Sequence, residues 1–396
     1  MEFRSLRTIL NAKLKSTPKS ILVVGPRQTG KSTLLRSLDV ALEINLANES
    51  VYRAHIKDPS LLEAMIAALK PKAKIVKILV DEIQRIPAML NTVQALVDEN
   101  AQLRFLLTGS SARKLKRGQV NLLPGRLFRY DLFPMTYWEL AHQWDLKKAL
   151  TLGTLPEVFL KDYGTELLGN YVDSYLREEV QAEALTRSVS SFARFLDLAA
   201  EASGQWLNYS QLSSDSEIPK ETLRRYVDIL EDTLLVHRLP GFTAIKGSRK
   251  ALQRERVIFF DMGVRNAVLG QHRNVFTDRQ MGDLFEQWFI NQIFALNSYG
   301  QHDWSLYSFR DDLKREVDLV IDRGKDLLAI EVKYSTRFDP RDLSGLKAFA
   351  SVAKKQVRAV IVYRGTTRQV RDGVEIVPYQ DFLRQLGGEQ SERDQK

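Results

Sequence analysis

The chain has 396 residues, about two to three times the usual size of one domain, so more than one hydrophobic core is expected. Lys and Arg number 58 against 49 Asp and Glu, and the resulting net charge of +9 favours phosphate-rich partners without identifying one. The chain has no cysteine, which excludes disulfides, thiolate metal sites and cysteine nucleophiles. No apolar run approaches the roughly 20 residues of a membrane-spanning helix, so we expect a cytoplasmic protein without a membrane partner.

A phosphate-binding loop is predicted close to the N-terminus. An apolar run at 21–24 is followed by Gly25-Pro-Arg-Gln-Thr-Gly-Lys31-Ser32, which fits G-x-x-x-x-G-K-[ST]. The glycines let backbone N–H groups turn toward an anion, and a helix that begins near Lys31 directs its positive end at phosphates. We expect Lys31 to contact the β and γ phosphates of ATP and Ser32 to bind Mg²⁺. The predicted nucleotide-binding residues of this loop are Gly25, Pro26, Arg27, Gln28, Thr29, Gly30, Lys31, Ser32 and Thr33.

Two later β-type runs are expected to complete the ATP site. The run at 76–80 ends in Asp81-Glu82, so Asp81 is predicted to bind Mg²⁺ and Glu82 to activate water. The run at 103–107 ends in Thr108-Gly-Ser-Ser, where Thr108 either senses the γ-phosphate or belongs to an ordinary turn. These runs alternate with helical stretches, which predicts a parallel sheet covered on both faces.

These motifs resemble those of the AAA+ ATPases. They are most similar to bacterial and archaeal ATP-binding proteins that pair an AAA domain with a C-terminal domain related to restriction endonucleases. The resemblance rests on residues 25–33, Asp81-Glu-Ile-Gln84 with Ile86-Pro87, Thr108-Gly-Ser110, Leu123-Pro-Gly-Arg126 and Pro134-Met-Thr-Tyr-Trp-Glu139-Leu. It implies a five-stranded AAA-type sheet.

A stretch at 113–129 carries six basic residues and no acidic one. It is either a loop that faces nucleic acid or a set of solvated charges. Within it, Arg126 follows a Pro-Gly turn and is our candidate for an arginine that stabilises charge on the nucleotide, with an ordinary surface arginine as the alternative.

The middle of the chain is predicted to be helical, with a winged-helix outline. Residues 207–213 and 218–230 are expected to form two helices before a strand at 234–239. The second helix would expose Lys220, Arg224 and Arg225, which contact DNA in one interpretation and are solvated beside a packing module in the other. A basic patch follows at Lys246, Arg249, Lys250, Arg254 and Arg256.

The last segment combines an amphipathic helix at 282–294 with a β-hairpin. Glu286 lies within the apolar stripe of that helix, where a lone acid is usually a boundary residue. The hairpin strands are 316–321 and 327–334, and Glu331 and Lys333 point to the same side of the second strand. An assumed four-residue loop after Ile321 puts Asp318 opposite Ala329, diagonal to Glu331.

An Asp and a Glu-x-Lys on paired strands suit metal-dependent phosphodiester cleavage, because two acids gather Mg²⁺ and a lysine orients or deprotonates water. The spacing resembles the PD-(D/E)xK nuclease motif, although Glu-x-Lys alone is as often an ion pair. By this resemblance Glu286, Asp318, Glu331 and Lys333 match the four functional positions, the three acids as metal ligands. A strand at 356–363 completes the α/β core. Six basic residues then suit a groove for a nucleic-acid backbone: Lys354, Lys355, Arg358, Arg364, Arg368 and Arg371.

We therefore predict an α/β multidomain protein. Residues 1–140 form a P-loop AAA-type ATPase domain, 141–260 a helical winged-helix connector, 261–386 a restriction-endonuclease-like domain, and 387–396 a frayed tail. The favoured function is an ATPase, with ATP and Mg²⁺ as cofactors, coupled to a metal-dependent nuclease that acts on DNA; assembly of several copies is open. The alternatives are a nucleotide-switched DNA- or protein-binding AAA+ protein whose nuclease-like domain does not cut, and a regulatory ATPase that binds protein partners.

Overall fold

The computed structural model describes residues 4–69, 74–110, 125–172, 189–243 and 255–393. These residues form two compact units, Met1–Glu139 with Asp232–Leu235, and Leu140–Glu231 with Val236–Lys396. The expected boundary between residues 260 and 261 therefore falls inside the second unit. No helix among the described residues is long and apolar enough to cross a membrane.

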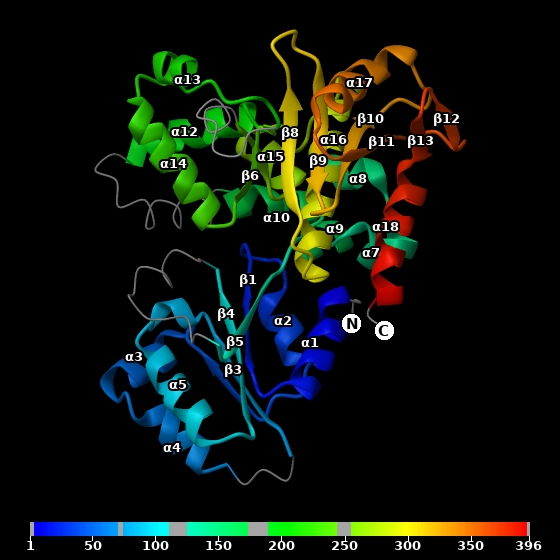
Figure 1. Ribbon diagram of the computed structural model, residues 1–396. Helices are drawn as coiled ribbons and strands as arrows, with labels where there is room; N and C mark the ends of the chain where they lie inside the picture. The colour runs from blue at the N-terminus through cyan, green and yellow to red at the C-terminus, as the bar shows by residue number, and fades with distance from the viewer. Residues whose placement is uncertain (1–3, 70–73, 111–124, 173–188, 244–254, 394–396) are drawn as a thin grey trace. The chain divides into compact units, whose positions relative to one another are not determined.

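The first unit contains a five-stranded parallel sheet (Figure 1). Its strand order is β2-β3-β4-β1-β5, and every pair is parallel. The elements are α1 Ser5–Ser16, β1 Ser20–Val24, α2 Lys31–Arg36, β2 Leu42–Asn45, α3 Glu49–Lys57, α4 Leu61–Ala67, β3 Val76–Asp81, η1 Ile83–Arg85, α5 Met89–Glu99, β4 Leu103–Gly109 and β5 Leu127–Asp131, with α7 Tyr137–Leu140 after them. This sheet is typical of P-loop ATPases and confirms the five strands that the resemblance implied.

Helices cover both faces of this sheet because its strands are apolar on both sides. Alternate residues of β1, such as Leu22 and Val24, pack into one core with α4 and α5, while α3 lies against the same core. In Figure 1, α1 and α2 lie on the opposite side of the sheet from α3, α4 and α5. Buried leucines of α1, including Leu6 and Leu10, anchor that second layer.

The second unit begins with helices and a two-stranded antiparallel sheet. The elements are α8 Leu146–Thr151, α9 Pro156–Leu160, α10 Gly164–Asn170, α12 Val189–Glu201, α13 Tyr209–Ser216, α14 Lys220–Asp232, β6 Val236–Pro240, β7 Glu255–Phe259 and α15 Met262–Val268. Phe192 and Phe195 of α12 contact Tyr226 of α14 edge-on or tilted, with ring centroids 4.9 and 5.3 Å away. Strands β6 and β7 pair in antiparallel register, and Trp206 forms an isolated bridge to Arg256.

A six-stranded mixed sheet forms the rest of this unit, in the order β12-β13-β11-β10-β9-β8. Its elements are α16 Asp278–Tyr299, β8 Ser305–Arg310, β9 Glu316–Asp322, β10 Asp326–Lys333, α17 Leu343–Val352, β11 Gln356–Tyr363, β12 Gln369–Arg371, β13 Val374–Pro378 and α18 Tyr379–Arg393. Helix α17 packs on one face, around Ala329 and Phe349, whereas Phe285 of α16 contacts Tyr334 on the other. Helix α18 continues to Arg393, so the tail expected to fray from 387 is helical up to that residue.

Candidate functional site

The predicted phosphate loop lies between the end of β1 and the start of α2. Gly30 has a φ of 91°, a left-handed conformation that favours glycine. A Cβ on Gly25 would lie 2.5 Å from the carbonyl oxygen of Leu132, which explains the first glycine of the motif. The ammonium of Lys31 donates hydrogen bonds of 2.9 Å to the carbonyl oxygens of Gly25 and Pro26. The lysine is therefore folded over the loop that is expected to surround phosphates.

Strands β3 and β4 and helix α2 bring the other predicted nucleotide-site residues together. Ser32 donates a hydrogen bond of 2.7 Å to Asp81 Oδ1, and Thr108 donates one of 2.5 Å to the same oxygen. Thr108 is completely buried and Asp81 is nearly so. Hydroxyl and carboxylate oxygens are the ligands that Mg²⁺ prefers, so Ser32 and Asp81 fit a Mg²⁺ site.

Glu82 is held by two residues that sequence reasoning did not assign to it. Its backbone has a φ of 59°, unusual for a residue other than glycine, and its N–H donates to Thr108 Oγ1 over 2.9 Å. Its carboxylate accepts hydrogen bonds from the Gln84 amide and, over 3.2 Å, from the hydroxyl of Ser110. The sequence Asp81-Glu-Ile-Gln84 was the available signal for Gln84. A strained residue with a fixed carboxylate at the end of a strand is typical of functional sites.

Arg126 does not lie at this nucleotide site, contrary to our expectation. It directly precedes β5, whose first residue Leu127 pairs with Ser20 at the start of β1. The phosphate loop follows the other end of β1, so the length of this strand, about 13 Å, separates Arg126 from the phosphate loop. The guanidinium of Arg126 instead donates to Asp98 Oδ1 of α5 over 2.5 Å. This position favours the alternative of an ordinary surface arginine over a contact with nucleotide in its own chain.

In the second unit, the hairpin of β9 and β10 has a different register from the one assumed. Val320, not Asp318, pairs with Ala329, because Asp322 stays in the strand and pairs with Leu327. The turn is then Arg323–Asp326, closed by a hydrogen bond of 3.1 Å from Arg323 N to Asp326 O. If this register is continued by one pair, Asp318 lies directly opposite Glu331. The two residues are then closer together than in the predicted diagonal arrangement.

The regular ladder between β9 and β10 ends next to Asp318. Its last pair is Leu319 with Ile330, and beyond it the N–H of Val332 donates to the side chain of Asp318 over 2.8 Å. The main-chain carbonyl of Asp318 accepts from Ser308 Oγ over 2.7 Å and from Arg256 over 3.2 Å. The strands therefore separate at Asp318, with its carboxylate directed at β10.

Asp318 and Glu331 form a buried acidic pair beside one lysine. Burial raises the pKa of Asp318 to about 7, and the charge of Glu286 adds to this. Burial also raises the pKa of Glu331 to about 8, and the charge of Asp318 adds to it. Lys333 lies 2.7 Å from Glu331 Oε1 and 3.7 Å from Asp342. The other oxygen of Glu331, Oε2, is buried and has no hydrogen-bond partner among the described residues.

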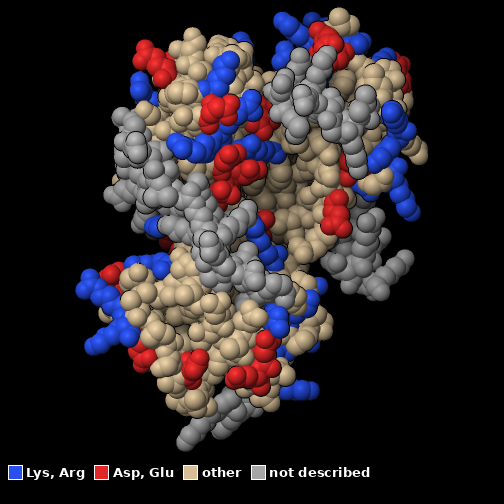
Figure 2. Space-filling model, turned by 60° about the vertical axis from the view of Figure 1, so that its left-hand side comes forward, with Lys and Arg blue, Asp and Glu red and all other residues tan. Residues whose placement is uncertain are grey.

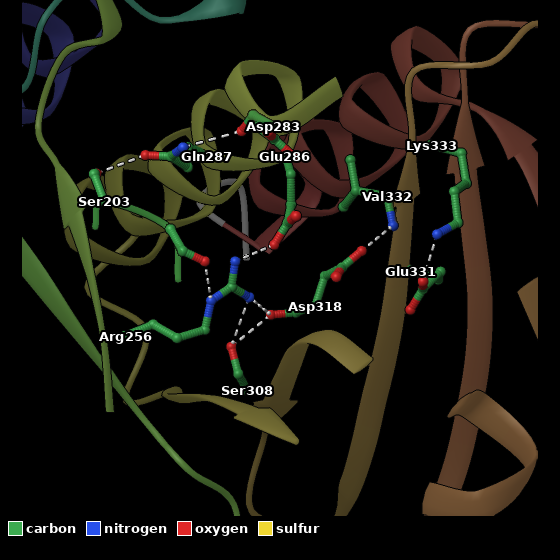
Figure 3. Close-up of polar contacts among 11 residues, drawn as sticks. Ser203, Arg256, Asp283, Glu286, Gln287, Ser308, Asp318, Glu331, Val332 and Lys333 are labelled. Atoms are coloured by element: carbon green, nitrogen blue, oxygen red, sulfur yellow. Dashed lines mark hydrogen bonds and ion pairs between the residues drawn. The ribbon is translucent and has the colours of Figure 1, made fainter. Parts of the chain in front are cut away.

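Glu286 is not brought into this pair. Its carboxylate forms an ion pair with Arg256 of β7, and Figure 3 shows Glu286 directed at Arg256 while Glu331 is directed at Lys333. Among the described residues, no three His, Asp or Glu side chains are arranged to hold one metal ion together. The predicted ligand set of Glu286, Asp318 and Glu331 is therefore not formed as a group. Arg256, predicted as part of a basic patch, is only 4% exposed.

Part of the last basic cluster is less free for nucleic acid than its sequence indicated, and two other clusters are described only in part. The basic residues at 113–117 and at 246–254 lie outside the described residues. In the last cluster, Lys355 pairs with Asp322 and Arg358 with Glu375. On the face that Figure 2 presents, Lys and Arg side chains lie among Asp and Glu side chains and do not form one continuous basic surface. Lys220, Arg224 and Arg225 of α14 are exposed, as predicted.

Three segments of the chain match known domain families. Residues 17–141 match an AAA domain, residues 143–274 a domain of unknown function (DUF8612) and residues 281–382 another (DUF4143). The first match, together with the parallel sheet, supports a P-loop ATPase that binds ATP. The other two descriptions name no activity, so the winged helix and the nuclease stay predictions.

Similar proteins cover most of the chain. Uncharacterized protein Rv2008c of Mycobacterium tuberculosis is 26% identical over 372 residues, which are 92% of this chain and 80% of that protein. An uncharacterized protein of Haemophilus influenzae is 21% identical and covers 94% of this chain and 96% of its own length. A solved structure, a DNA polymerase III gamma subunit-related protein of Thermotoga maritima, is 12% identical and covers 73% of this chain and 99% of its own, with a TM-score of 0.29. A TM-score this low does not support an inference about the fold or function of this chain.

Proposed function

We propose that this chain is an ATP-hydrolysing P-loop protein whose ATPase unit controls a cation-dependent phosphodiester-cleaving site in the second unit, with DNA as the substrate. The observation that carries the ATPase part is the convergence of Ser32 and Thr108 on one oxygen of Asp81, beside Lys31. Lys31 would hold the β and γ phosphates, while Ser32 and Asp81 would hold Mg²⁺. Bound Mg²⁺ would neutralise charge on the phosphates. Glu82 would orient and deprotonate the attacking water.

Phosphate release and ATP binding by wild type and Glu82→Gln test this part. The glutamine amide that replaces the carboxylate cannot accept a proton from water, so we expect ATP binding within about threefold of wild type and hydrolysis slowed by at least about 100-fold. Unchanged hydrolysis would remove Glu82 from the reaction. Loss of binding would mean that Glu82 acts on the loop and not on the water.

The cleaving site is proposed at Asp318, Glu331 and Lys333. The two carboxylates come from neighbouring strands, and the buried Glu331 Oε2 lacks a hydrogen-bond partner in the part of the chain that the structure describes, as suits a cation ligand. A divalent cation held there would polarise a phosphodiester. Lys333, which donates to Glu331, would orient the attacking water.

DNA contact is proposed through α14 in a winged-helix arrangement. Helices α12, α13 and α14 are followed by the antiparallel pair β6 and β7, the order of elements in that module. Lys220, Arg224 and Arg225 are exposed on α14, and the guanidinium of Arg224 lies over the ring of Tyr209 at 4.5 Å. Cations on one helix suit the phosphate backbone of DNA.

A second candidate function is a nucleotide switch that binds DNA or protein without cutting. It is favoured by one observation: Glu286, the third acid of the expected metal site, is bound to Arg256. A site with two carboxylates holds a cation more weakly than one with three. A chain that hydrolyses ATP but cuts no DNA substrate with Mg²⁺ or Mn²⁺ would favour this second function.

A further inference from the structure

Arg256 is a buried arginine whose guanidinium contacts four separate parts of the second unit. Its Nε donates to the carbonyl oxygen of Gly204 over 2.7 Å, and Nη1 donates to Ser308 Oγ over 3.1 Å and to the carbonyl oxygen of Asp318 over 3.2 Å. Its Nη2 donates to Glu286. Figure 3 shows the guanidinium between Glu286, Ser308 and the main chain of Asp318. Arg256 therefore joins β7 to β8, β9 and α16.

The positive charge of Arg256 has one carboxylate in direct contact among the described residues, that of Glu286. The other acceptors are a hydroxyl and two main-chain carbonyls, which carry no full negative charge. A buried cation that loses its counter-ion is strongly destabilising. If Glu286 turned away to a metal ion, Arg256 would keep only the more distant charges of Asp318 and Glu316 and would lie near a second cation. The ion pair therefore disfavours Glu286 as a member of the ligand set that the sequence motif indicated.

We infer that Arg256 is the permanent counter-ion of Glu286 and positions the main chain of Asp318, so that a divalent cation in this unit is bound by Asp318 and Glu331 without Glu286. The pair holds α16 and β9 together where β9 leaves β10. Arg256 thus acts as a positioning residue, since its contact with Asp318 fixes the strand from which that carboxylate projects. The cation part of this inference rests on the proposed function, whereas the counter-ion part stands by itself.

Mn²⁺ binding to the full chain without nucleotide, followed by electron paramagnetic resonance, tests the ligand set. We expect Glu331→Gln to weaken binding at least about tenfold and Glu286→Gln to change it by less than about threefold. Asp303→Asn, an exposed carboxylate of the same unit, is the control and leaves binding unchanged. Equal weakening by Glu286→Gln and Glu331→Gln would overturn the inference, because Glu286 would then be a ligand.

A thermal-unfolding cycle tests the counter-ion assignment separately. Arg256→Met and Glu286→Met should each lower the midpoint by roughly 5 °C or more, because each leaves one buried charge unpaired. The double variant should lose clearly less stability than the sum, since neither charge is left, and should bind Mn²⁺ about tenfold or more weakly than wild type because the contact that positions Asp318 is gone. Additive losses would overturn the ion pair.

These two experiments separate failure of the inference from failure of the proposed function. A variant that carries both Asp318→Asn and Glu331→Gln is compared with wild type. If wild type binds no more Mn²⁺ than this variant, the proposed cation site and the ligand set inferred for it are overturned. A non-additive unfolding cycle in the same preparation would still support Arg256 as the counter-ion of Glu286.

Discussion

Ser32 and Asp81 are joined by a hydrogen bond of 2.7 Å from the serine hydroxyl to the aspartate Oδ1. Ser32 lies in the first turn of α2 and Asp81 ends β3, and β3 and β1 are separated in the sheet by β4. Thr108 of β4 donates to the same oxygen of Asp81. The helix start that follows the phosphate loop and the Asp81 carboxylate therefore face one another, which is what Mg²⁺-dependent ATP hydrolysis requires.

Lys31→Ala should weaken ATP binding at least about tenfold, because hydrogen bonds from a charged group to phosphate each contribute about 1.5–3 kcal/mol. Fluorescence of a labelled ATP measures the affinity. Lys57→Ala, at the exposed end of α3, is the matched control. Circular dichroism should report unchanged folding. Tight ATP binding by Lys31→Ala would contradict the assignment of the phosphate loop.

Gln84→Leu should slow ATP hydrolysis about 10- to 100-fold while ATP affinity stays within about threefold. The Gln84 amide donates to the carboxylate of Glu82 and to Ser110 Oγ, so its loss frees Glu82 to leave its position. Steady-state phosphate release and nucleotide affinity are measured together, with Gln102→Leu on an exposed turn as the control. A kcat equal to that of wild type would show that Glu82 needs no such support.

Glu331→Gln should stabilise the second unit at high pH. The folded chain raises the pKa of Glu331 to about 8 and that of Asp318 to about 7, from ordinary values of 4.5 and 3.8. Raised pKa values favour the protonated folded state, so the stability they contribute is complete below about pH 4 and is lost as the pH rises through about 7 to 8. Glutamine resembles the protonated acid and avoids this loss.

The measurement is thermal unfolding in EDTA at about pH 4 and about pH 9. We expect the variant to gain at least ~1 kcal/mol over wild type at the higher pH, which corresponds to about 2–4 °C, and little at the lower pH. Asp303→Asn should show no such dependence. A variant that is less stable than wild type at both values would contradict the buried acidic pair.

Replacing Lys220, Arg224 and Arg225 by alanine should weaken DNA binding and lower its salt dependence. Each phosphate contact contributes about 0.9 to the slope of log affinity against log salt concentration, so the slope should fall by up to about 3. Fluorescence anisotropy over a salt series measures it, with Lys161→Ala as a control elsewhere in the unit. An unchanged slope would assign DNA binding, if present, to another surface.

The motifs with local patterns were predictable, whereas contacts that depend on packing were not. The nucleotide site could be predicted because parallel strands that end in polar residues bring those ends to one edge of a sheet. Its residues are Gly25 to Ser32, Asp81 and Thr108. Asp318 and Glu331 were expected near each other, but the register was wrong, since nothing local indicates whether Asp322 belongs to the strand or to the turn.

The two misassigned arginines show why charge runs alone mislead. Arg256 precedes a buried β run and looked like part of a surface patch, yet a carboxylate 30 residues later neutralises it inside the unit. Arg126 looked close to the nucleotide because it follows a motif of the resemblance, but the parallel pairing of β5 with β1 places it at the far edge. Both outcomes depend on tertiary pairing, which composition does not reveal.

The most direct test of the account is DNA cleavage by the full chain. Wild type, Asp318→Asn and the control Asp303→Asn are compared on linear, nicked and branched DNA with Mg²⁺ or Mn²⁺, with and without ATP. The account predicts that wild type and the control cut at least one substrate, that ATP changes the rate, and that Asp318→Asn cuts at least about 100-fold more slowly with an unchanged ATPase rate. Cleavage of no substrate by wild type, or equal cleavage by Asp318→Asn, would contradict it.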